Sequence, residues 1–246
     1  MEKIQIIILA AGHGKRMQNE LPKVLLPLHG KPLIAHILKS IKESGVCDKP
    51  IVVVGQQREL VMKTLGADYE YVIQEEQLGT GHAISCAEKK CGGAEHIVVF
   101  SGDQPFVSVK TIKNLVDRHL RSDAIITLTT TRVTDFENWR SVFKAFGRIL
   151  RKNGGVIGIR EYKDANETER NIKEVNAGCY VFDANWLWAN LKKIKNENIQ
   201  KEYYLTDLIK IATEEKVRIK SIDIDAREAL GANSTEDLEV LESLTA

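Results

Sequence analysis

The apolar residues of the chain follow two alternating patterns. Short runs rich in β-branched residues predict strands at residues 4–9, 51–54, 71–74, 97–100, 124–129 and 217–224. The runs at 4–9, 51–54 and 97–100 are almost continuously apolar, which is typical of strands buried on both faces of a sheet. The chain is therefore expected to contain a sheet that is covered on both sides.

Segments with helical periodicity fill the intervals between these strands. Pro32 opens a segment in which Leu33, Ile37 and Ile41 share one face, and Gly45 ends it, which is the usual order of helix start and stop signals. Similar patterns predict helices near residues 57–65, 80–91, 108–121, 183–195, 204–215 and 234–243. Alternating strands and helices predict an α/β fold with a Rossmann-like, mostly parallel twisted sheet flanked by helices.

Composition and charge narrow the possible partners. The 246 residues are 43% hydrophobic and 28% charged, with a net charge of +1, so bulk charge favours neither nucleic acid nor an anionic membrane as a partner. No apolar run is long enough to cross a membrane and no signal-peptide pattern is present, so we expect a cytoplasmic protein. The four cysteines lack metal-site spacing and are interpreted as reduced core thiols.

A glycine-rich loop follows the first apolar run. Gly12 and Gly14 allow backbone N–H groups to approach phosphate oxygens, and Lys15, Arg16 and Lys23 supply positive charge. The loop is not a dinucleotide fingerprint, because a third glycine would be needed where Met17 stands, and its spacing does not fit a Walker loop. A Gly-x-Gly pair by itself is often only a tight turn, but together with the cations this loop predicts a polyphosphate site.

Further strings follow the loop in a recognisable order. They are QEEQLGTGHA at residues 74–83, GDQP at 102–105, EVNAG at 174–178, EYYLTD at 202–207 and GAN at 231–233. With the loop at residues 9–25, they make the chain similar over roughly residues 3–240 to the sugar-nucleotide pyrophosphorylases. It most resembles the uridyltransferase half of the bacterial bifunctional N-acetylglucosamine-1-phosphate uridyltransferases/acetyltransferases. The strings at 74–83 and 202–207 are the narrowest of these signals.

The resemblance implies a nucleotide-diphospho-sugar transferase fold of the GT-A-like type and a Mg²⁺-dependent reaction. In this reaction UTP and N-acetylglucosamine 1-phosphate give UDP-N-acetylglucosamine, a cell-wall precursor, and pyrophosphate, without a covalent intermediate. Asp103 and Asn233 correspond to the Mg²⁺ ligands, and Arg16 and Lys23 to the cations that stabilise the transferred phosphate. Alternatively, Asp103 forms only a turn and Asn233 only caps the last helix.

Two further groups of positions follow from the same resemblance. The nucleotide is expected at Leu9, Ala10, Ala11, Gly12, Gly14, Gln74, Gly79 and Thr80, and the sugar at Gly147, Glu161, Asn176, Tyr204 and Thr206. The amide of Gln74 offers uracil both a donor and an acceptor. His82 lies in the same string, but the reaction needs no histidine, and we expect it to pack or cap a helix.

The chain departs from the family pattern at three places. Lys15 replaces a common threonine, and Ser101 stands where a tyrosine is common. We expect the loss of the tyrosine to enlarge the sugar pocket or to loosen its preference for N-acetylglucosamine. Residues 135–160 form a longer segment than expected, interpreted as a lid-like insertion over the sugar site. These departures keep open another sugar 1-phosphate, such as glucose or galactosamine 1-phosphate, or dTTP in place of UTP. A non-catalytic sugar-nucleotide sensor is the other alternative.

Domain organisation follows from length and from the absence of hexapeptide repeats. We expect one nucleotidyltransferase domain over residues 1–246, without the C-terminal acetyltransferase domain of the bifunctional relatives. The chain is then either a single-function protein or a piece of a longer one. Without the acetyltransferase domain, a monomer or weak oligomer is expected.

Overall fold

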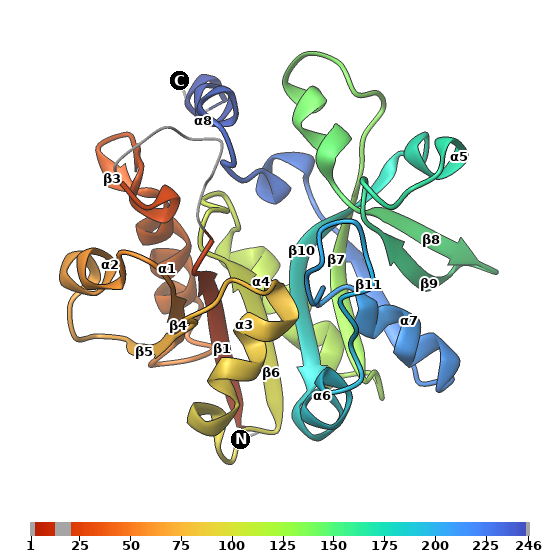
Figure 1. Cartoon of the computed structure of the whole chain (residues 1–246), viewed down its shortest axis with the longest axis horizontal. Helices are drawn as coiled ribbons and strands as arrows, with labels where there is room; N and C mark the ends of the chain where they lie inside the picture. The colour runs from red at the N-terminus through yellow and green to blue at the C-terminus, as the bar shows by residue number, and fades with distance from the viewer. Residues whose placement is uncertain (1–2, 13–20, 245–246) are drawn as a thin grey trace.

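The computed structural model describes residues 3–12 and 21–244. Within these residues the main sheet contains nine strands, and seven of them lie in the order β11-β7-β10-β6-β1-β4-β5 (Figure 1). Their bounds are β1 (Ile4–Ala10), β4 (Ile51–Val54), β5 (Glu70–Ile73), β6 (His96–Ser101), β7 (Ile126–Arg132), β10 (Glu174–Asp183) and β11 (Ile219–Asp223). All six predicted strands are present, with ends displaced by three residues at most.

Six of these seven strands run in the same direction. Strand β1 pairs in parallel with β4 and β6, β4 with β5, and β7 with β11, whereas β10 is antiparallel to both β6 and β7. The mostly parallel sheet is therefore confirmed, with β10 as the reversed strand. Strand β10 was not predicted, because it begins with polar residues and is interrupted at Gly178, whose φ of 82° accompanies a shift of register.

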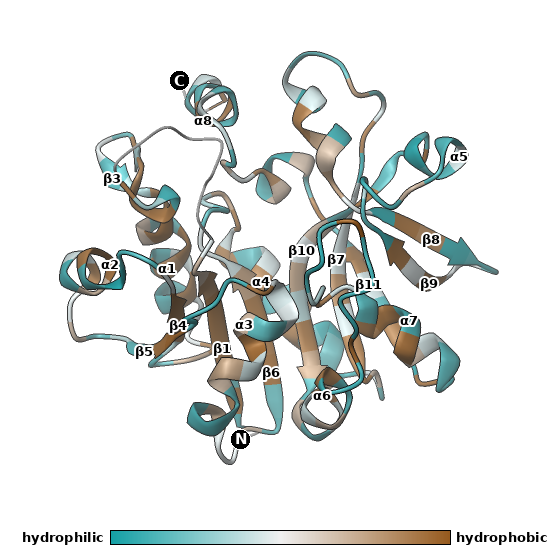
Figure 2. Ribbon diagram, viewed as in Figure 1, coloured by the Kyte–Doolittle hydropathy of each residue, from teal (hydrophilic) through white to brown (hydrophobic). Residues whose placement is uncertain are grey.

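Helices cover both faces of the sheet. On one side lie α1 (Leu33–Ser44), α2 (Arg58–Leu65) and α4 (Val109–Leu120), and on the other α3 (Thr80–Ala87), α6 (Ala184–Leu191) and α7 (Asp207–Glu214). Successive residues of β1 point alternately to the two sides, so Ile6 and Ile8 join one core and Ile7 the other. Apolar strands between half-polar helices are visible in Figure 2.

A third apolar cluster lies beyond the carboxyl ends of the parallel strands. It joins Phe143 of a 3-10 helix, η3 (Asn138–Ala145), to Val175 of β10 and Leu241 of the last helix, α8 (Thr235–Ser243). Shorter elements complete the description: the 3-10 helices η1 (Lys23–Leu25), η2 (Glu88–Cys91) and η4 (Ala226–Ala229), the helix α5 (Glu167–Arg170), and the small sheet β2 (Pro27–Leu28) with β3 (Lys31–Pro32).

The segment expected to form a lid has two different parts. Its first part contains η3, and its second part is a hairpin of β8 (Arg148–Lys152) and β9 (Gly155–Arg160) that joins the main sheet through Arg148 opposite Val175. Asn153 and Gly154 have φ values of 51° and 79°, as a two-residue Asn-Gly hairpin turn requires. Residues 148–160 thus belong to the sheet, and the interpretation of the whole segment as a lid-like insertion stays a prediction. No helix in the described part of the chain is long and apolar enough to cross a membrane.

Candidate active site

One lysine joins the two predicted metal ligands. The Nζ atom of Lys23 lies 2.5 Å from Oδ2 of Asp103 and 2.8 Å from Oδ1 of Asn233. The Asp103 residue is only 4% exposed, and the Lys23 side chain is largely buried as well. Three residues that are far apart in sequence thus bring a cation and two oxygen atoms to one point.

Backbone contacts explain how this cluster is assembled. Asp103 follows the end of β6, and the preceding Gly102 donates its N–H to the carbonyl oxygen of Leu9 in β1 at 2.9 Å. The N–H of Ala232 reaches the carbonyl oxygen of Asp103 at 3.3 Å, and a Cβ on Gly231 would lie 3.2 Å from that oxygen. A small residue at 231 lets the loop approach Asp103 closely, which places Asn233 beside it.

The structure bears on the alternative in which Asn233 only caps the last helix. The residue that caps α8 is Ser234, whose side chain accepts a hydrogen bond from the N–H of Asp237. The side-chain oxygen of Asn233 instead accepts a hydrogen bond from Lys23. Similarly, the Asp103 carboxylate is bonded by the side chains of Lys23 and Ser101, which is more than a turn-forming role requires.

The donor set fits Mg²⁺. A carboxylate oxygen and an amide oxygen are hard ligands, and both already face a single cationic group, the Lys23 ammonium. The described residues contain no cluster of three or more His, Cys, Asp or Glu side chains that could hold a metal. Two protein oxygens nevertheless suffice for Mg²⁺, which usually completes its coordination with substrate phosphates and water.

Four of the five predicted sugar-binding residues lie together. The Thr206 hydroxyl donates to Oε1 of Glu161 at 2.9 Å, and the N–H of Asn176 donates to the carbonyl oxygen of Gly147 at 2.9 Å. A Cβ on Gly147 would come within 3.3 Å of Oε1 of Glu161, which places these two pairs side by side. Burial is the largest cause of a raised pKa for Glu161, opposed by the bond from Thr206.

A single cleft of about 320 Å³ connects the cluster around Lys23 with these predicted sugar-binding residues. Its walls include Lys23, Asp103, Asn233, Glu161, Asn176 and Thr206, with Leu9 and Thr80 from the predicted nucleotide side. Tyr204 is not among its lining residues and lies instead in a larger outer groove. The cleft opens at the carboxyl ends of β1 and β6, which is where ligands bind in sheets of this kind.

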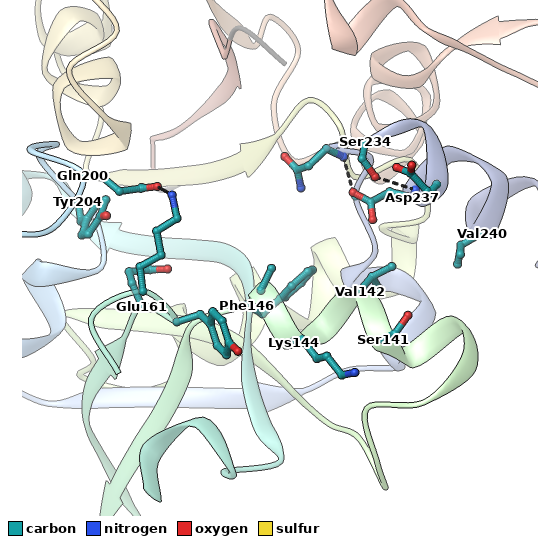
Figure 3. Close-up of a pocket in the computed structure, with 16 residues that line it drawn as sticks. Ser141, Val142, Lys144, Phe146, Glu161, Gln200, Tyr204, Ser234, Asp237 and Val240 are labelled. Atoms are coloured by element: carbon teal, nitrogen blue, oxygen red, sulfur yellow. Dashed lines mark hydrogen bonds between the residues drawn. The ribbon is translucent and has the colours of Figure 1, made fainter. Parts of the chain in front are cut away.

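The outer groove of about 730 Å³ adjoins the cleft. Figure 3 shows Ser141 and Val142 of the η3 segment facing Asp237 and Val240 of α8, with Gln200 and Tyr204 at the other end. Phe146, Glu161 and Asn233 line both cavities. The η3 segment therefore forms one wall of the groove that leads to the predicted sugar site.

Three of the predicted nucleotide-binding residues, Gln74, Gly79 and Thr80, lie in a segment that is held by hydrogen bonds and close packing. Gln74 is 3% exposed; its Nε2 donates to the carbonyl oxygen of Gly79 at 3.1 Å and lies 3.1 Å from Nδ1 of His82. Gly79 has a φ of 112°, and a Cβ there would lie 2.6 Å from the carbonyl oxygen of Tyr203, so only glycine fits. The Thr80 hydroxyl accepts a hydrogen bond from the N–H of Leu205 at 2.9 Å.

The glycine-rich loop is only partly described. Ala10 and Ala11 are buried, and a Cβ on Gly12 would lie 3.7 Å from Cε of Lys23. Gly14, Lys15 and Arg16 lie outside the described residues, so their predicted contacts with phosphate stay predictions.

Sequence reasoning did not predict three contacts that shape the site, although it had singled out Ser101 as a departure near the sugar pocket. The Ser101 hydroxyl donates to Oδ1 of Asp103 at 2.5 Å, and Nε2 of Gln104 donates to the carbonyl oxygens of Ala177 and Ala229. A Cβ on Gly55 would lie 2.6 Å from the carbonyl oxygen of Ala11. The position of Gly55, directly after a buried strand, was an available signal, because Gly102 also follows its strand directly.

The fold, together with the position of the cleft, is that of the nucleotide-diphospho-sugar transferases. Residues 6–152 match the family model of the MobA-like NTP transferase domain, and the chain belongs to this family. It is 40% identical over 240 residues to the bifunctional protein GlmU of Clostridium perfringens, covering 97% of this chain and 51% of that protein. For GlmU of Desulfotalea psychrophila the values are 39%, 96% and 68%. The resemblance predicted from the sequence is confirmed.

The chain spans about half the length of the clostridial relatives it matches. Among solved structures, a proposed glucose-1-phosphate thymidylyltransferase of Bacillus anthracis superposes with a TM-score of 0.78 at 20% identity, covering 98% of this chain and 94% of that one. A UDP-glucose pyrophosphorylase with bound UDP-glucose gives 0.71 at 20% identity, covering 100% and 99%. At this level of identity, the two likenesses establish the fold.

Proposed function

We propose that this chain is a nucleotidyltransferase that transfers the uridylyl group of UTP to N-acetylglucosamine 1-phosphate and releases pyrophosphate. The observation that carries the proposal is the single cleft in which Lys23, Asp103 and Asn233 lie beside Glu161, Asn176 and Thr206. The group of Lys23, Asp103 and Asn233 suits phosphate groups. Glu161, Asn176 and Thr206 offer acceptors and donors for sugar hydroxyls. The 40% identity to GlmU proteins supports the narrower choice of substrates.

The reaction needs little covalent chemistry from the protein. An oxygen of the sugar phosphate attacks the α-phosphorus of UTP, the new P–O bond forms, and the bond to the bridging oxygen of the β-phosphate breaks, which releases pyrophosphate. The attacking phosphate is already anionic at neutral pH, so a general base is unnecessary. Positioning and charge stabilisation dominate such transfers, and the Lys23 ammonium supplies positive charge at the edge of the cleft.

The remaining residues hold the two substrates. Asp103 and Asn233 would hold Mg²⁺, which when bound neutralises phosphate charge and orients the substrates. Glu161 and Asn176 would bind sugar hydroxyls, with the Thr206 hydroxyl fixing the orientation of the Glu161 carboxylate. The loop of Gln74, Gly79 and Thr80 would hold the uracil ring, and Gly12, Gly14 and Arg16 the phosphates. A cytoplasmic location and a monomer or weak oligomer complete the proposal.

Another sugar 1-phosphate is the second candidate substrate. Ser101 presents a small side chain to the cleft, and residues of η3 line the groove beyond it. Both departures from the family pattern thus lie in the walls of the proposed site. A sensor without turnover fits less well, because a binding protein has little need for two metal ligands and a lysine between them.

A substrate panel tests the proposal. Pyrophosphate release would be measured in Mg²⁺ with UTP or dTTP against the 1-phosphates of N-acetylglucosamine, glucose and galactosamine, and the product identified by mass spectrometry. Clear preference for UTP and N-acetylglucosamine 1-phosphate is expected. Preference for another pair would replace the substrate assignment, and no release with any pair would contradict the proposed enzyme activity.

A further inference from the structure

We propose that Ser101 is a positioning residue that fixes the Asp103 carboxylate for metal binding. The inference rests on the proposed function only in so far as that function places a divalent cation at Asp103. The Ser101 hydroxyl donates to Oδ1 of Asp103 at 2.5 Å, while Oδ2 faces Nζ of Lys23 at 2.5 Å. Each carboxylate oxygen thus has its own partner, and the carboxylate cannot turn without breaking a bond.

The position of Ser101 in the sheet makes this contact possible. Ser101 is the last residue of β6 and lies opposite Leu9 of β1. Because side chains alternate along a strand, Phe100 enters the core under α1 and α4, whereas Ser101 shares the face of Val99 and lines the cleft. The strand ends there, and the turn at Gly102 brings the Asp103 carboxylate back over the hydroxyl.

The Ser101 hydroxyl is a neutral donor, and this affects how strongly the Asp103 carboxylate attracts a cation. A hydroxyl group stabilises one carboxylate oxygen without cancelling its charge, so Oδ2 keeps its attraction for a cation beside Oδ1 of Asn233. That position is held by the Lys23 ammonium, which a metal must replace there. Without the hydroxyl, both carboxylate oxygens become available to Lys23, and the lysine competes with the metal more strongly.

Removal of the hydroxyl should therefore weaken metal binding while the fold persists. Outer partners of metal ligands typically change metal affinity by about 10-fold or more when they are removed. We expect Ser101→Ala to raise the Mn²⁺ concentration needed for half-saturation roughly 10-fold. Ser101→Thr keeps the hydroxyl and should stay within about 3-fold of the wild type. Ser122→Ala is the matched control, because the Ser122 hydroxyl donates to the backbone carbonyl oxygens of Arg118 and His119 in α4.

Binding of Mn²⁺ to the substrate-free protein gives a readout independent of turnover. Paramagnetic broadening of the backbone amide signals of Ala232 and Gly102 would be followed during a Mn²⁺ titration, with circular dichroism as the check of folding. A 10-fold shift for Ser101→Ala, with rescue by Ser101→Thr, supports the inference. Unchanged affinity in Ser101→Ala, or equal loss in Ser101→Thr, would overturn it.

The same titration separates the two proposals. If the wild type shows no broadening at Ala232 and Gly102, the metal site is wrong and the role of Ser101 is overturned with it. Pyrophosphate release by the same preparation then shows by itself whether transferase activity survives. If broadening follows the expected pattern but no transfer occurs, the role of Ser101 stands and the proposed function fails.

Discussion

The backbone N–H of Asn176 donates a hydrogen bond to the carbonyl oxygen of Gly147, 2.9 Å away. This bond attaches the end of the η3 segment to β10, the reversed strand of the sheet. Both residues are predicted to contact the sugar, and Glu161 lies next to Gly147. The bond therefore fixes the distance between two sides of the proposed sugar site.

A side chain at position 147 should disturb sugar binding selectively. A Cβ there would lie 2.8 Å from Cγ2 of Ile159 and 3.3 Å from Oε1 of Glu161, so one of these groups must move. We expect Gly147→Ala to raise KM for the sugar 1-phosphate roughly 10-fold, as a loss of about 1.4 kcal/mol in binding would do, and to leave KM for UTP unchanged. Steady-state kinetics with each substrate varied in turn provide the measurement.

The matched control is Gly158→Ala in β9. A Cβ there would make ordinary contacts, the nearest at 3.5 Å to Leu150, and none of its close neighbours is a predicted sugar-binding residue. Equal effects of the two variants, or a change in KM for UTP with Gly147→Ala, would contradict the placement of the sugar beside Gly147.

Arg148 should contribute strongly to stability. It is 1% exposed, and its guanidinium donates to the carbonyl oxygens of Phe143, Lys144, Phe146 and Arg170. Burial lowers its pKa, and no ion pair with a carboxylate is found for it within the described ranges. Arg148→Lys keeps the charge but loses the planar set of donors, leaving buried carbonyls unpaired.

We expect Arg148→Lys to lose about 2 to 4 kcal/mol of unfolding free energy, which lowers Tm by roughly 5 to 15 °C in a chain of this size. Differential scanning calorimetry provides the measurement. Arg218→Lys is the control, because Arg218 forms an ion pair with Asp123 at the surface and should melt like the wild type. A Tm for Arg148→Lys equal to that of the control would show that the buried guanidinium is dispensable.

Stability should depend on pH through His119. The residue is 2% exposed, its Nδ1 lies 3.0 Å from the Thr127 hydroxyl and its Nε2 lies 3.2 Å from Nδ1 of His96. Burial, with a smaller effect of His96, lowers the pKa of His119 to about 4. The unfolded chain, with a histidine pKa of about 6.5, therefore binds a proton at this residue between about pH 4 and pH 6.5, whereas the folded chain does not.

The unfolding free energy should thus fall as the pH is lowered from about 6.5 to about 4, by up to about 3 kcal/mol from this group. Urea unfolding at several pH values measures the slope. In His119→Gln this part of the slope should disappear, whereas His36→Gln, which leaves the His96 and His119 pair intact, should retain it. An unchanged slope in His119→Gln would mean that other groups cause the acid sensitivity.

The sequence was sufficient for the parts of the molecule that rest on local patterns. The continuous apolar runs of β1, β4 and β6 identified the centre of the sheet, because strands buried on both faces leave that signal. Glycine at the C-cap of α1, with a φ of 67°, ended that helix where expected. The family resemblance likewise grouped Lys23, Asp103 and Asn233, and the structure places these three side chains in contact.

Contacts between distant segments could not be predicted. Strand β10 is stabilised by its neighbours β6 and β7, and its own polar start and Gly178 conceal it. Ser234 rather than Asn233 caps α8, and the Asn233 side chain instead accepts a hydrogen bond from Lys23, which lies 210 residues away. The bond from Ser101 to Asp103 depends on the turn at the end of β6, which the residue types alone do not specify.

The most direct test of the account concerns Asp103. Asp103→Asn removes the charge that faces Lys23 and the proposed metal, while Asp123→Asn removes an exposed charge at the surface. Transfer from UTP to N-acetylglucosamine 1-phosphate in Mg²⁺ would be measured as pyrophosphate release, with Tm as the check of folding. We expect Asp103→Asn to lose at least about 100-fold in turnover, with a folded protein, and Asp123→Asn to match the wild type. Near-normal turnover by Asp103→Asn would contradict the account.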